Sequence, residues 1–181
     1  MMMEKDRAIL VVVDVQTRLL GGVHESERLV QNCSWLVRLA NMMGVPVIGS
    51  EQYPQGVGHT EDNLRELIGA EKIFGKTFFS CIDDPGFEKA FEAHDRKQVV
   101  LCGMESQACV VQSALRLLER GQEVFVVADA ISARNPFDTE IALRRMEQAG
   151  ARLITREMAG FEWLRRSDAE EFRQFSKEFL R

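Results

Sequence analysis

Three side chains with complementary chemistry each follow a short apolar run of the chain: Asp14, Lys76 and Cys109. A carboxylate, an ammonium and a thiol can act as a general base, a cation and a nucleophile, which is the set that an activated thiol requires. If the fold brings them together, they indicate catalysis through sulfur. Taken singly, each has a simpler interpretation. Asp14 could cap backbone N–H groups, Lys76 could be a solvated loop lysine, and Cys109 could fill space in the core.

Cys109 lies at a chemically favourable position in the pattern. Residues 99–102 form a short unbroken apolar run, which is typical of a strand buried on both faces. Apolar residues then recur at helical spacing from Val110 onward, with Ser106 as a candidate N-cap, so Cys109 should lie in the first turn of a helix. The N–H groups of a helix start stabilise an anion and can form an oxyanion hole. Together with Lys76, this position predicts a depressed pKa for the Cys109 thiol.

The other three cysteines offer less chemistry. Cys33 falls within an amphipathic helical pattern and Cys102 within a buried strand pattern, so both should be inert, while Cys81 lies in a predicted loop. No pair has Cys-x-x-Cys spacing and no Cys/His cluster has zinc-ligand spacing. The charged N-terminal residues do not resemble a signal peptide, so we expect a cytoplasmic protein with reduced thiols.

The elements that must position these residues alternate along the chain. Predicted strands cover residues 8–13, 45–48, 72–74, 99–102, 124–128 and 152–154. Predicted helices cover residues 26–43, a short segment after Thr60, residues 85–93, the segment after Ser106, residues 139–148 and a final segment from Ser167 with Glu170 in a capping box. This alternation predicts an α/β fold, a three-layer α/β/α, Rossmann-like domain with a six-stranded parallel sheet. In such sheets ligands bind beyond the carboxyl ends of the strands, where the winding reverses. Asp14 and Cys109 would meet there if the first and fourth strands are neighbours.

Composition limits the classes of function. The chain has 181 residues, of which 45% are hydrophobic and 28% charged, with a net charge of −5. We therefore expect one globular domain over residues 1–181. The acidic balance argues against nucleic acid as a partner, and no apolar run is long enough to span a membrane. We therefore expect the partner to be a small-molecule substrate.

Three segments carry a resemblance to a known family. They are the Asp14 run with Gln16, the Gly-Lys76-Thr-x-Phe79-Ser segment, and the Gly103-Met-Glu-Ser-Gln-Ala-Cys109 segment. In this order the chain resembles the isochorismatase-like cysteine hydrolases over most of its length. Within that family it is most similar to the small isochorismatase-domain-containing proteins of unassigned substrate.

The resemblance implies a role for each matching residue. Cys109 would be the nucleophile, Asp14 the general base, and Lys76 the cation that supports both. The peptide bond between Met104 and Glu105 would be cis, and the backbone N–H groups of Glu105 and Cys109 would form the oxyanion hole. The implied activity is hydrolysis of a C–N bond in a small amide-type substrate through a thioester.

The sequence also departs from the family pattern. Nicotinamidases of this family carry an Asp-x-His pair and a further histidine that hold a metal, whereas the corresponding segment here runs from Ser50 to Tyr53 and lacks that pair. We therefore expect no catalytic metal, no cofactor and no nicotinamidase activity. Gln107 and Ala108 stand where the family often has His and Val, which leaves the shape of the pocket open.

Four residues are weaker candidates for substrate contacts: Gln16, Tyr53, Phe79 and Arg134. Tyr53 could also be a plain loop aromatic, and core packing could explain Phe78 or Phe79. Arg134 could reach an anionic substrate, and Asn135 could simply form a turn before Pro136.

Two further questions stay open on the sequence alone. The chain could be a catalytically inactive or regulatory family member that acts as a binding or interaction scaffold, because a fold does not prove a function. Family members commonly form homo-oligomers, and the apolar residues Phe172, Phe175 and Phe179 recur at helical spacing and need cover. Packing on the chain's own core would also cover them.

Overall fold

The computed structural model describes residues 1–180 as a parallel six-stranded sheet with helices on both faces. The strand order is β3-β2-β1-β4-β5-β6, so the winding reverses between β1 and β4. This confirms the predicted fold class. The first and fourth strands are neighbours, which is the condition under which Asp14 and Cys109 were expected to meet. The strands are β1 (Ala8–Val13), β2 (Val47–Gln52), β3 (Ile73–Lys76), β4 (Gln98–Met104), β5 (Glu123–Ser132) and β6 (Arg152–Ile154).

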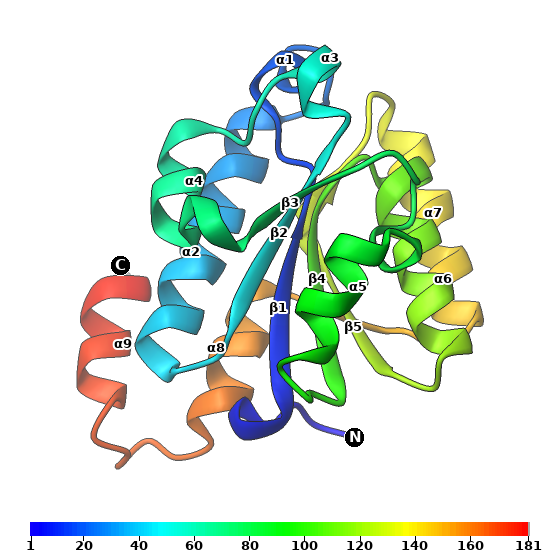
Figure 1. Cartoon of the computed structure of the whole chain (residues 1–181). Coiled ribbons are helices and arrows are strands. Elements are labelled where there is room, and N and C mark those ends of the chain that lie inside the picture. Colours follow the sequence, from blue (N-terminus) through cyan, green and yellow to red (C-terminus); the bar gives the residue numbers. More distant parts are fainter. Residues whose placement is uncertain (181) are drawn as a thin grey trace.

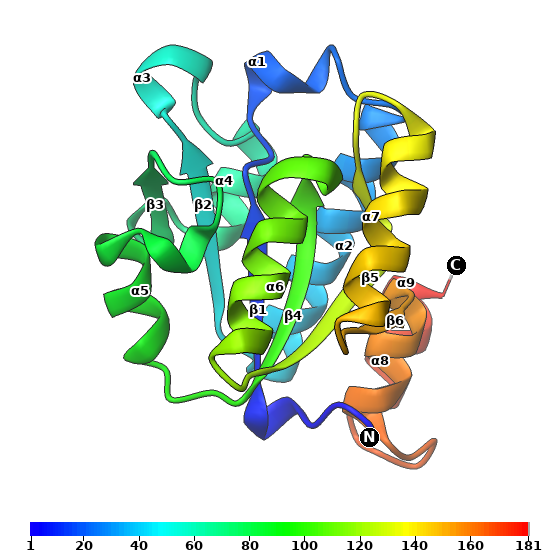
Figure 2. The same cartoon turned by 90° about the vertical axis from the view of Figure 1, so that its right-hand side faces the viewer.

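The helices form two outer layers (Figure 1). The α-helices are α1 (Thr17–Leu20), α2 (Ser26–Met43), α3 (Pro54–Val57), α4 (Asp62–Ile68), α5 (Pro85–Glu92), α6 (Val111–Glu119), α7 (Pro136–Gln148), α8 (Arg156–Leu164) and α9 (Phe172–Phe179). Helices α2, α4, α8 and α9 cover one face of the sheet, and Figure 2 shows α5, α6 and α7 across the other. The short helices α1 and α3 lie at the carboxyl ends of the strands, at the top of Figure 1.

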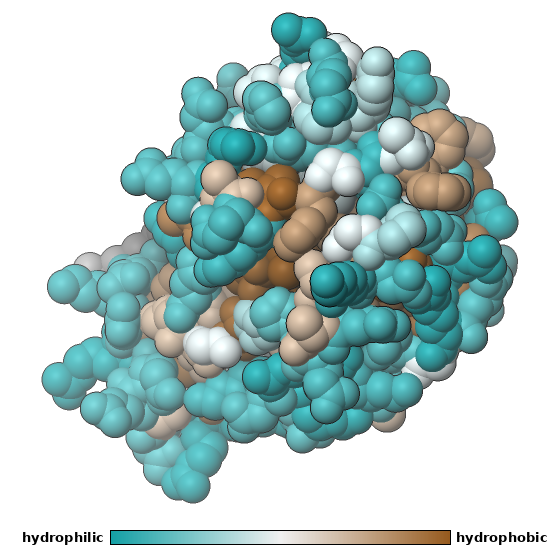
Figure 3. Space-filling model, in the orientation of Figure 1, coloured by the Kyte–Doolittle hydropathy of each residue, from teal (hydrophilic) through white to brown (hydrophobic). Residues whose placement is uncertain are grey.

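The unbroken apolar run of β1 is explained by cover on both faces. Ile9, Val11 and Val13 pack into the core beneath α5, α6 and α7, whereas Leu10 and Val12 pack into the core beneath α2. Both faces are dry, so the usual alternation of apolar and polar residues is absent. At the edge of the sheet the cover is thinner. Figure 3 shows apolar surface in the middle of the face that β3 presents, surrounded by hydrophilic residues.

The C-terminal segment differs from the sequence prediction. Helix α8 was not predicted, and the last helix begins at Phe172 rather than at Ser167. Phe175 and Phe179 are buried, and both rings meet Trp35 of α2 edge to face, with centroids 6.2 and 5.1 Å apart. The chain therefore covers these two residues itself, and they give no argument for an oligomer.

Strands β2 and β5 extend furthest beyond their predicted ends, by four residues each. Strand β2 continues through Glu51 and Gln52, which pair with Gly75 and Lys76 of β3. Strand β5 continues through residues 129–132, beyond its predicted end at residue 128, and its register shifts relative to β4 between Leu101 and Gly103. Both extensions lengthen the sheet at the edge where ligands are expected. Within residues 1–180, no helix combines the length and apolarity needed to cross a membrane.

Candidate active site

A buried ion pair lies at the carboxyl ends of β1 and β3. Lys76 Nζ lies 2.8 Å from Asp14 Oδ2, and neither side chain is more than 1% exposed. The other carboxylate oxygen, Oδ1, accepts a hydrogen bond of 2.7 Å from Ser50 Oγ. Asp14 has a positive φ of 50°, which turns its side chain out of the strand direction. Lys76 is the last residue of β3, and sequence had placed it beyond that strand.

The Lys76 ammonium has acceptors on several sides. Besides Asp14, it donates to Gln52 Oε1 at 2.6 Å and to the backbone carbonyls of Phe78 and Phe79, each at 3.1 Å. Burial opposes the charged form, but the negative charge of Asp14, with smaller contributions from the neighbouring thiols, raises the pKa of Lys76 above its ordinary value. The ammonium therefore stays charged at neutral pH.

Cys109 lies in a single π-helical turn, η4 (Ser106–Val110), which leads into α6. Its side chain is 6% exposed, and Sγ lies 3.8 Å from Gln52 Oε1. Cys33, Cys81 and Cys102 are all 1% exposed or less, so Cys109 is the most accessible of the four thiols. Ser106, the predicted cap, makes no cap bond and instead contacts Thr139 Oγ1 at 3.2 Å.

The prediction of a depressed thiol pKa is wrong for the resting protein. Burial, and next the negative charge of Asp14, raise the pKa of the Cys109 thiol far above its ordinary value, and the opposing effect of Lys76 is smaller. The sequence argument weighed the helix start and the cation but gave the desolvation of a buried sulfur too little weight. Cys109 is therefore a neutral thiol at neutral pH and needs a base before it can attack.

Gly103 allows β1 and β4 to approach closely beside this site. It has a φ of +117°, and a Cβ at this position would lie 2.1 Å from the carbonyl oxygen of Val13. Val13 directly precedes Asp14, and Gly103 pairs with it across the two strands. The glycine thus permits the backbone geometry that sets Asp14 next to the turn carrying Cys109.

The segment before Cys109 contains the predicted special backbone. The Met104–Glu105 peptide bond is cis. The Glu105 carbonyl accepts from the N–H groups of Ala108 and Val110, at 3.1 and 3.2 Å, and neither bond uses the N–H of Cys109. The Glu105 carboxylate pairs with Arg134 Nε at 3.1 Å. Arg134 therefore lies near this segment with its charge already balanced by a carboxylate.

The other candidate substrate contacts divide into one buried and two exposed residues. Gln16 is fully buried, and its amide bonds to the backbone of Gln52 and to the carbonyl of Gly58, so it fastens the segment that follows β2. Tyr53 and Phe79 are each 55% exposed and Phe78 is 53% exposed, so the expectation that core packing explains Phe78 or Phe79 is wrong. Contact of any of these residues with a substrate stays a prediction. Asn135 accepts from the Phe137 N–H and caps α7.

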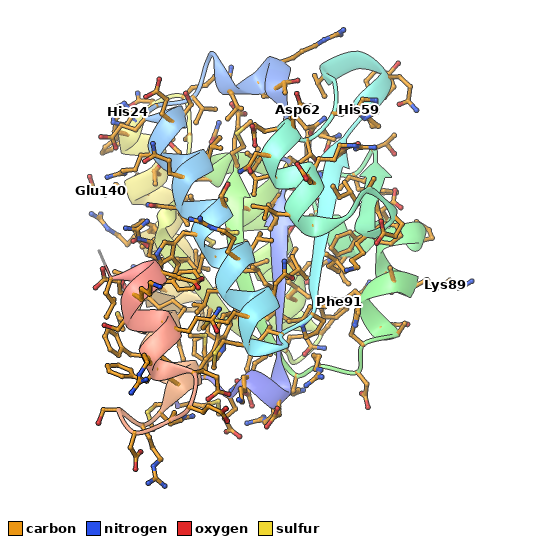
Figure 4. The ribbon with its side chains drawn as sticks, turned by 90° about the vertical axis from the view of Figure 1, so that its left-hand side faces the viewer. His24, His59, Asp62, Lys89, Phe91 and Glu140 are labelled. Carbon is orange, nitrogen blue, oxygen red and sulfur yellow. The ribbon has the colours of Figure 1, made fainter. Side chains whose placement is uncertain are left out.

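Sequence reasoning missed Ser50, Glu51 and Gln52. The predicted strand ended at residue 48, because Pro and Gly follow closely and favour a loop. Glu51 is 4% exposed and accepts from Thr60 N, Thr60 Oγ1 and Arg65 at 2.7, 2.8 and 3.0 Å, with His59 Nδ1 at 3.2 Å from its second oxygen. Figure 4 shows His59 at the end of the molecule where α4 begins, far from Phe91 of α5. Glu51 therefore fastens the segment between β2 and α4.

Metal ligands were not expected here. Among residues 1–180, no group of three or more His, Cys, Asp or Glu side chains is placed to hold a metal ion. Gln52 of the Ser50–Tyr53 segment contributes a neutral amide to the site. That the reaction needs no metal stays a prediction, and it is tested below.

Comparison with known proteins agrees with a hydrolase of this architecture. The isochorismatase domain family matches residues 8–158. Isochorismatase domain-containing protein 2A of Mus musculus is 35% identical over 175 residues, which cover 95% of this chain and 82% of the mouse protein. The chain therefore belongs to the isochorismatase-like hydrolase family.

Solved structures give the same assignment. The structure of MAR1 ribonuclease from Caenorhabditis elegans has a TM-score of 0.93 and 34% identity and covers 100% of this chain and 93% of its own. YcaC from Pseudomonas aeruginosa, solved with hexane-2,5-diol and covalent acrylamide, has a TM-score of 0.90 and 29% identity. The match covers 97% of this chain and 90% of the YcaC chain. YcaC from Escherichia coli, described as an octameric hydrolase of unknown specificity, has a TM-score of 0.87 and 29% identity. The match covers 92% of this chain and 83% of the YcaC chain.

Proposed function

We propose that the protein is a cysteine hydrolase that cleaves the C–N bond of a small amide-type substrate through a thioester, with Asp14, Lys76 and Cys109 as its catalytic residues. The observation that carries this proposal is the buried ion pair of Asp14 and Lys76 beside Cys109, at the reversal of the sheet. Burying two charges is costly, and well-packed apolar residues would serve stability at least as well. A catalytic role explains why this pair lies next to the most accessible thiol.

The reaction begins with a proton transfer because the resting thiol is neutral. Asp14 takes the proton from Cys109 as the sulfur attacks the acyl carbon, and the carbonyl oxygen becomes an oxyanion. The N–H groups of Glu105 and Cys109 stabilise this oxyanion. The C–N bond then breaks, the amine leaves with the proton from Asp14, and the acyl group remains on sulfur as a thioester.

Water completes the cycle. Asp14, now ionised again, takes a proton from a water molecule that attacks the thioester carbonyl, and the C–S bond breaks. The carboxylic acid product leaves and the sulfur recovers its proton from Asp14. Lys76 remains an ammonium throughout and balances the negative charge that passes between Asp14 and the sulfur. We place Tyr53, Phe79 and Arg134 around the substrate, and Gln16 acts indirectly, through the backbone of Gln52 and Gly58 that its amide holds.

The decisive experiment is a search for the thioester. The protein is incubated with a panel of small amides, quenched in acid, and its intact mass measured. A mass increase equal to the acyl group, absent in Cys109→Ala, supports the proposal. Turnover of an amide by the Cys109→Ala variant contradicts it. Turnover that falls on adding EDTA and returns with zinc or iron would show that the expectation of a metal-free reaction is wrong.

Two other functions are outcomes of the same experiments. An intact site with no adduct from any amide, together with no turnover, would favour a binding or interaction scaffold. The ribonuclease name of the C. elegans neighbour gives another activity to test. The net charge of −5 disfavours RNA, since phosphate binding draws on Lys and Arg. Cleavage of single-stranded RNA that disappears in Cys109→Ala would replace the amide with RNA as substrate.

We also propose that the protein forms a homo-oligomer and acts as one domain. The octameric description of the E. coli neighbour supports assembly. Exposed apolar side chains on α7, namely Phe137 and Ile141, offer surface for it. Light scattering at micromolar concentration should give a multiple of the 20.6 kDa chain mass, and a monomer mass would contradict the assembly.

A further inference from the structure

We propose that Gln52 is a positioning residue whose amide oxygen accepts hydrogen bonds from both the Cys109 thiol and the Lys76 ammonium, and so holds the thiol in its resting, protonated form. This inference rests on the proposed function of the same site. It adds a residue to which no catalytic part has been assigned.

The amide of Gln52 is fixed in one orientation. Its backbone N–H donates to Gln16 Oε1 at 2.7 Å, and its backbone carbonyl accepts from Gln16 Nε2 at 3.0 Å. At the tip of the side chain, Nε2 donates to the carbonyl of Thr77 at 3.0 Å. A flipped amide would turn an N–H toward the ammonium and lose the Thr77 bond, so the oxygen is the atom that faces the site.

That oxygen lies between the two reactive groups. Gln52 Oε1 is 2.6 Å from Lys76 Nζ and 3.8 Å from Cys109 Sγ. An ammonium has three N–H donors, whereas Lys76 has four acceptors in reach: Asp14, Gln52 and the carbonyls of Phe78 and Phe79. No N–H is left over for a thiolate. A thiolate would also face the negative end of the amide dipole, so both effects favour the neutral thiol.

The same arrangement stabilises the site during proton transfer. When Asp14 accepts the thiol proton it loses its charge, and its bond to Lys76 weakens. The ammonium then keeps Gln52 and the two backbone carbonyls as acceptors and stays in place. Gln52 therefore keeps the Cys109 thiol protonated before substrate binds and keeps the Lys76 ammonium in place during proton transfer.

The test is the pH profile of Cys109 alkylation, which needs no substrate. Wild type and variants are treated with iodoacetamide from pH 6 to 11, and the rate at Cys109 is mapped by peptide mass spectrometry. Gln52→Glu adds a negative charge beside the sulfur and should slow alkylation about tenfold at a given pH. This corresponds to a pKa of the Cys109 thiol that is about one unit higher. Gln52→Met has a similar length but replaces the amide oxygen with a weakly accepting sulfur, and should accelerate alkylation by about the same factor.

Matched controls separate this role from a structural one. Gln55→Glu and Gln55→Met make the same changes at an exposed position three residues away and should leave the profile unchanged. Gln52→Asn keeps the amide but moves its oxygen away from the site, without changing the charge. It should accelerate alkylation as Gln52→Met does, so the result does not depend on the folding of one variant. Shifts of Gln52→Glu and Gln52→Met in the same direction, or no shift in either, would overturn the proposal. A search that finds neither a thioester nor turnover of any amide would overturn the hydrolase function and leave this result standing.

Discussion

The Lys76 ammonium lies 2.8 Å from Asp14 Oδ2, although 62 positions separate the two residues in the chain. Asp14 directly follows β1 and Lys76 is the last residue of β3, and β2 lies between these strands. The contact therefore depends on the order of the strands and on Asp14 leaving the strand direction at a positive φ. Neither charge has access to water, so each depends on the other for compensation.

Removing one member of this pair should destabilise the protein. We expect Asp14→Asn and Lys76→Met each to lower the free energy of unfolding by about 3–5 kcal/mol, because each leaves a buried charge or acceptor without its partner. The double variant should lose much less than the sum of the two. Urea denaturation followed by circular dichroism measures all three. Additive losses would show that the two side chains do not compensate each other.

The catalytic roles predict non-additive losses of activity. Cys109→Ala and Asp14→Asn should each lower kcat/KM by a factor on the order of 10³ or more, and the double variant should be no slower than the slower single variant, because both residues serve one step. Cys109→Ala should keep the wild-type free energy of unfolding within about 1 kcal/mol, since alanine fits the same turn. Steady-state kinetics on an identified amide measures the three rates. If the loss of kcat/KM in the double variant equals the two single losses multiplied together, the two residues serve different steps.

The raised pKa of Cys109 predicts slow alkylation at neutral pH. The thiolate fraction, and with it the rate of reaction with iodoacetamide, should rise about tenfold per pH unit between pH 7 and pH 9 without reaching a plateau. Cys109 should still be labelled before the three fully buried cysteines in the native protein. Lys76→Met should slow the reaction further, since Lys76 favours the thiolate. A plateau below pH 8 would restore the original expectation of a depressed pKa.

Gly103 predicts a large effect from a single added methyl group. Gly103→Ala should destabilise the protein by roughly 3 kcal/mol or more, because its Cβ would lie 2.1 Å from the Val13 carbonyl oxygen. Gly150 is the matched control: its φ of +109° is similar, but no atom lies within 4 Å of the added Cβ. Gly150→Ala should therefore cost only the strain of the backbone, about 1–2 kcal/mol. If chemical denaturation shows that both variants lose the same free energy of unfolding, the close contact between β1 and β4 is not the cause of the loss.

Glu51 predicts a pH-dependent contribution to stability. Burial opposes the carboxylate, but the hydrogen bonds from Thr60 and His59 outweigh it and lower the pKa of Glu51 below 4.5. Because the folded pKa is the lower one, this stabilisation is complete above the unfolded pKa and is lost as pH falls through the folded value. Glu51→Gln should cost about 1–3 kcal/mol at pH 7 and flatten the acid side of the stability curve. An unchanged acid slope in thermal unfolding scans would contradict this.

The sequence by itself determined the order of the six strands and the positions of the three reactive residues. Ala8–Val13 is apolar throughout because both faces of the sheet are covered, and the spacing after Cys109 is that of a helix, so local patterns were enough. The resemblance to a family rested on the same segments. Each of these signals lies within about twenty consecutive residues, which is why sequence could carry them.

Only the tertiary structure decided the surroundings of those residues. Glu51 and Gln52 have the local composition of a loop, yet they belong to a strand because they pair with Gly75 and Lys76 of β3. The pKa of Cys109 is set by burial and by a carboxylate 95 positions earlier in the chain, since desolvation depends on everything packed around the sulfur. Likewise, Gln52 reaches both Lys76 and Cys109 because three strands and a helical turn converge at one edge of the sheet, an arrangement that no local pattern encodes.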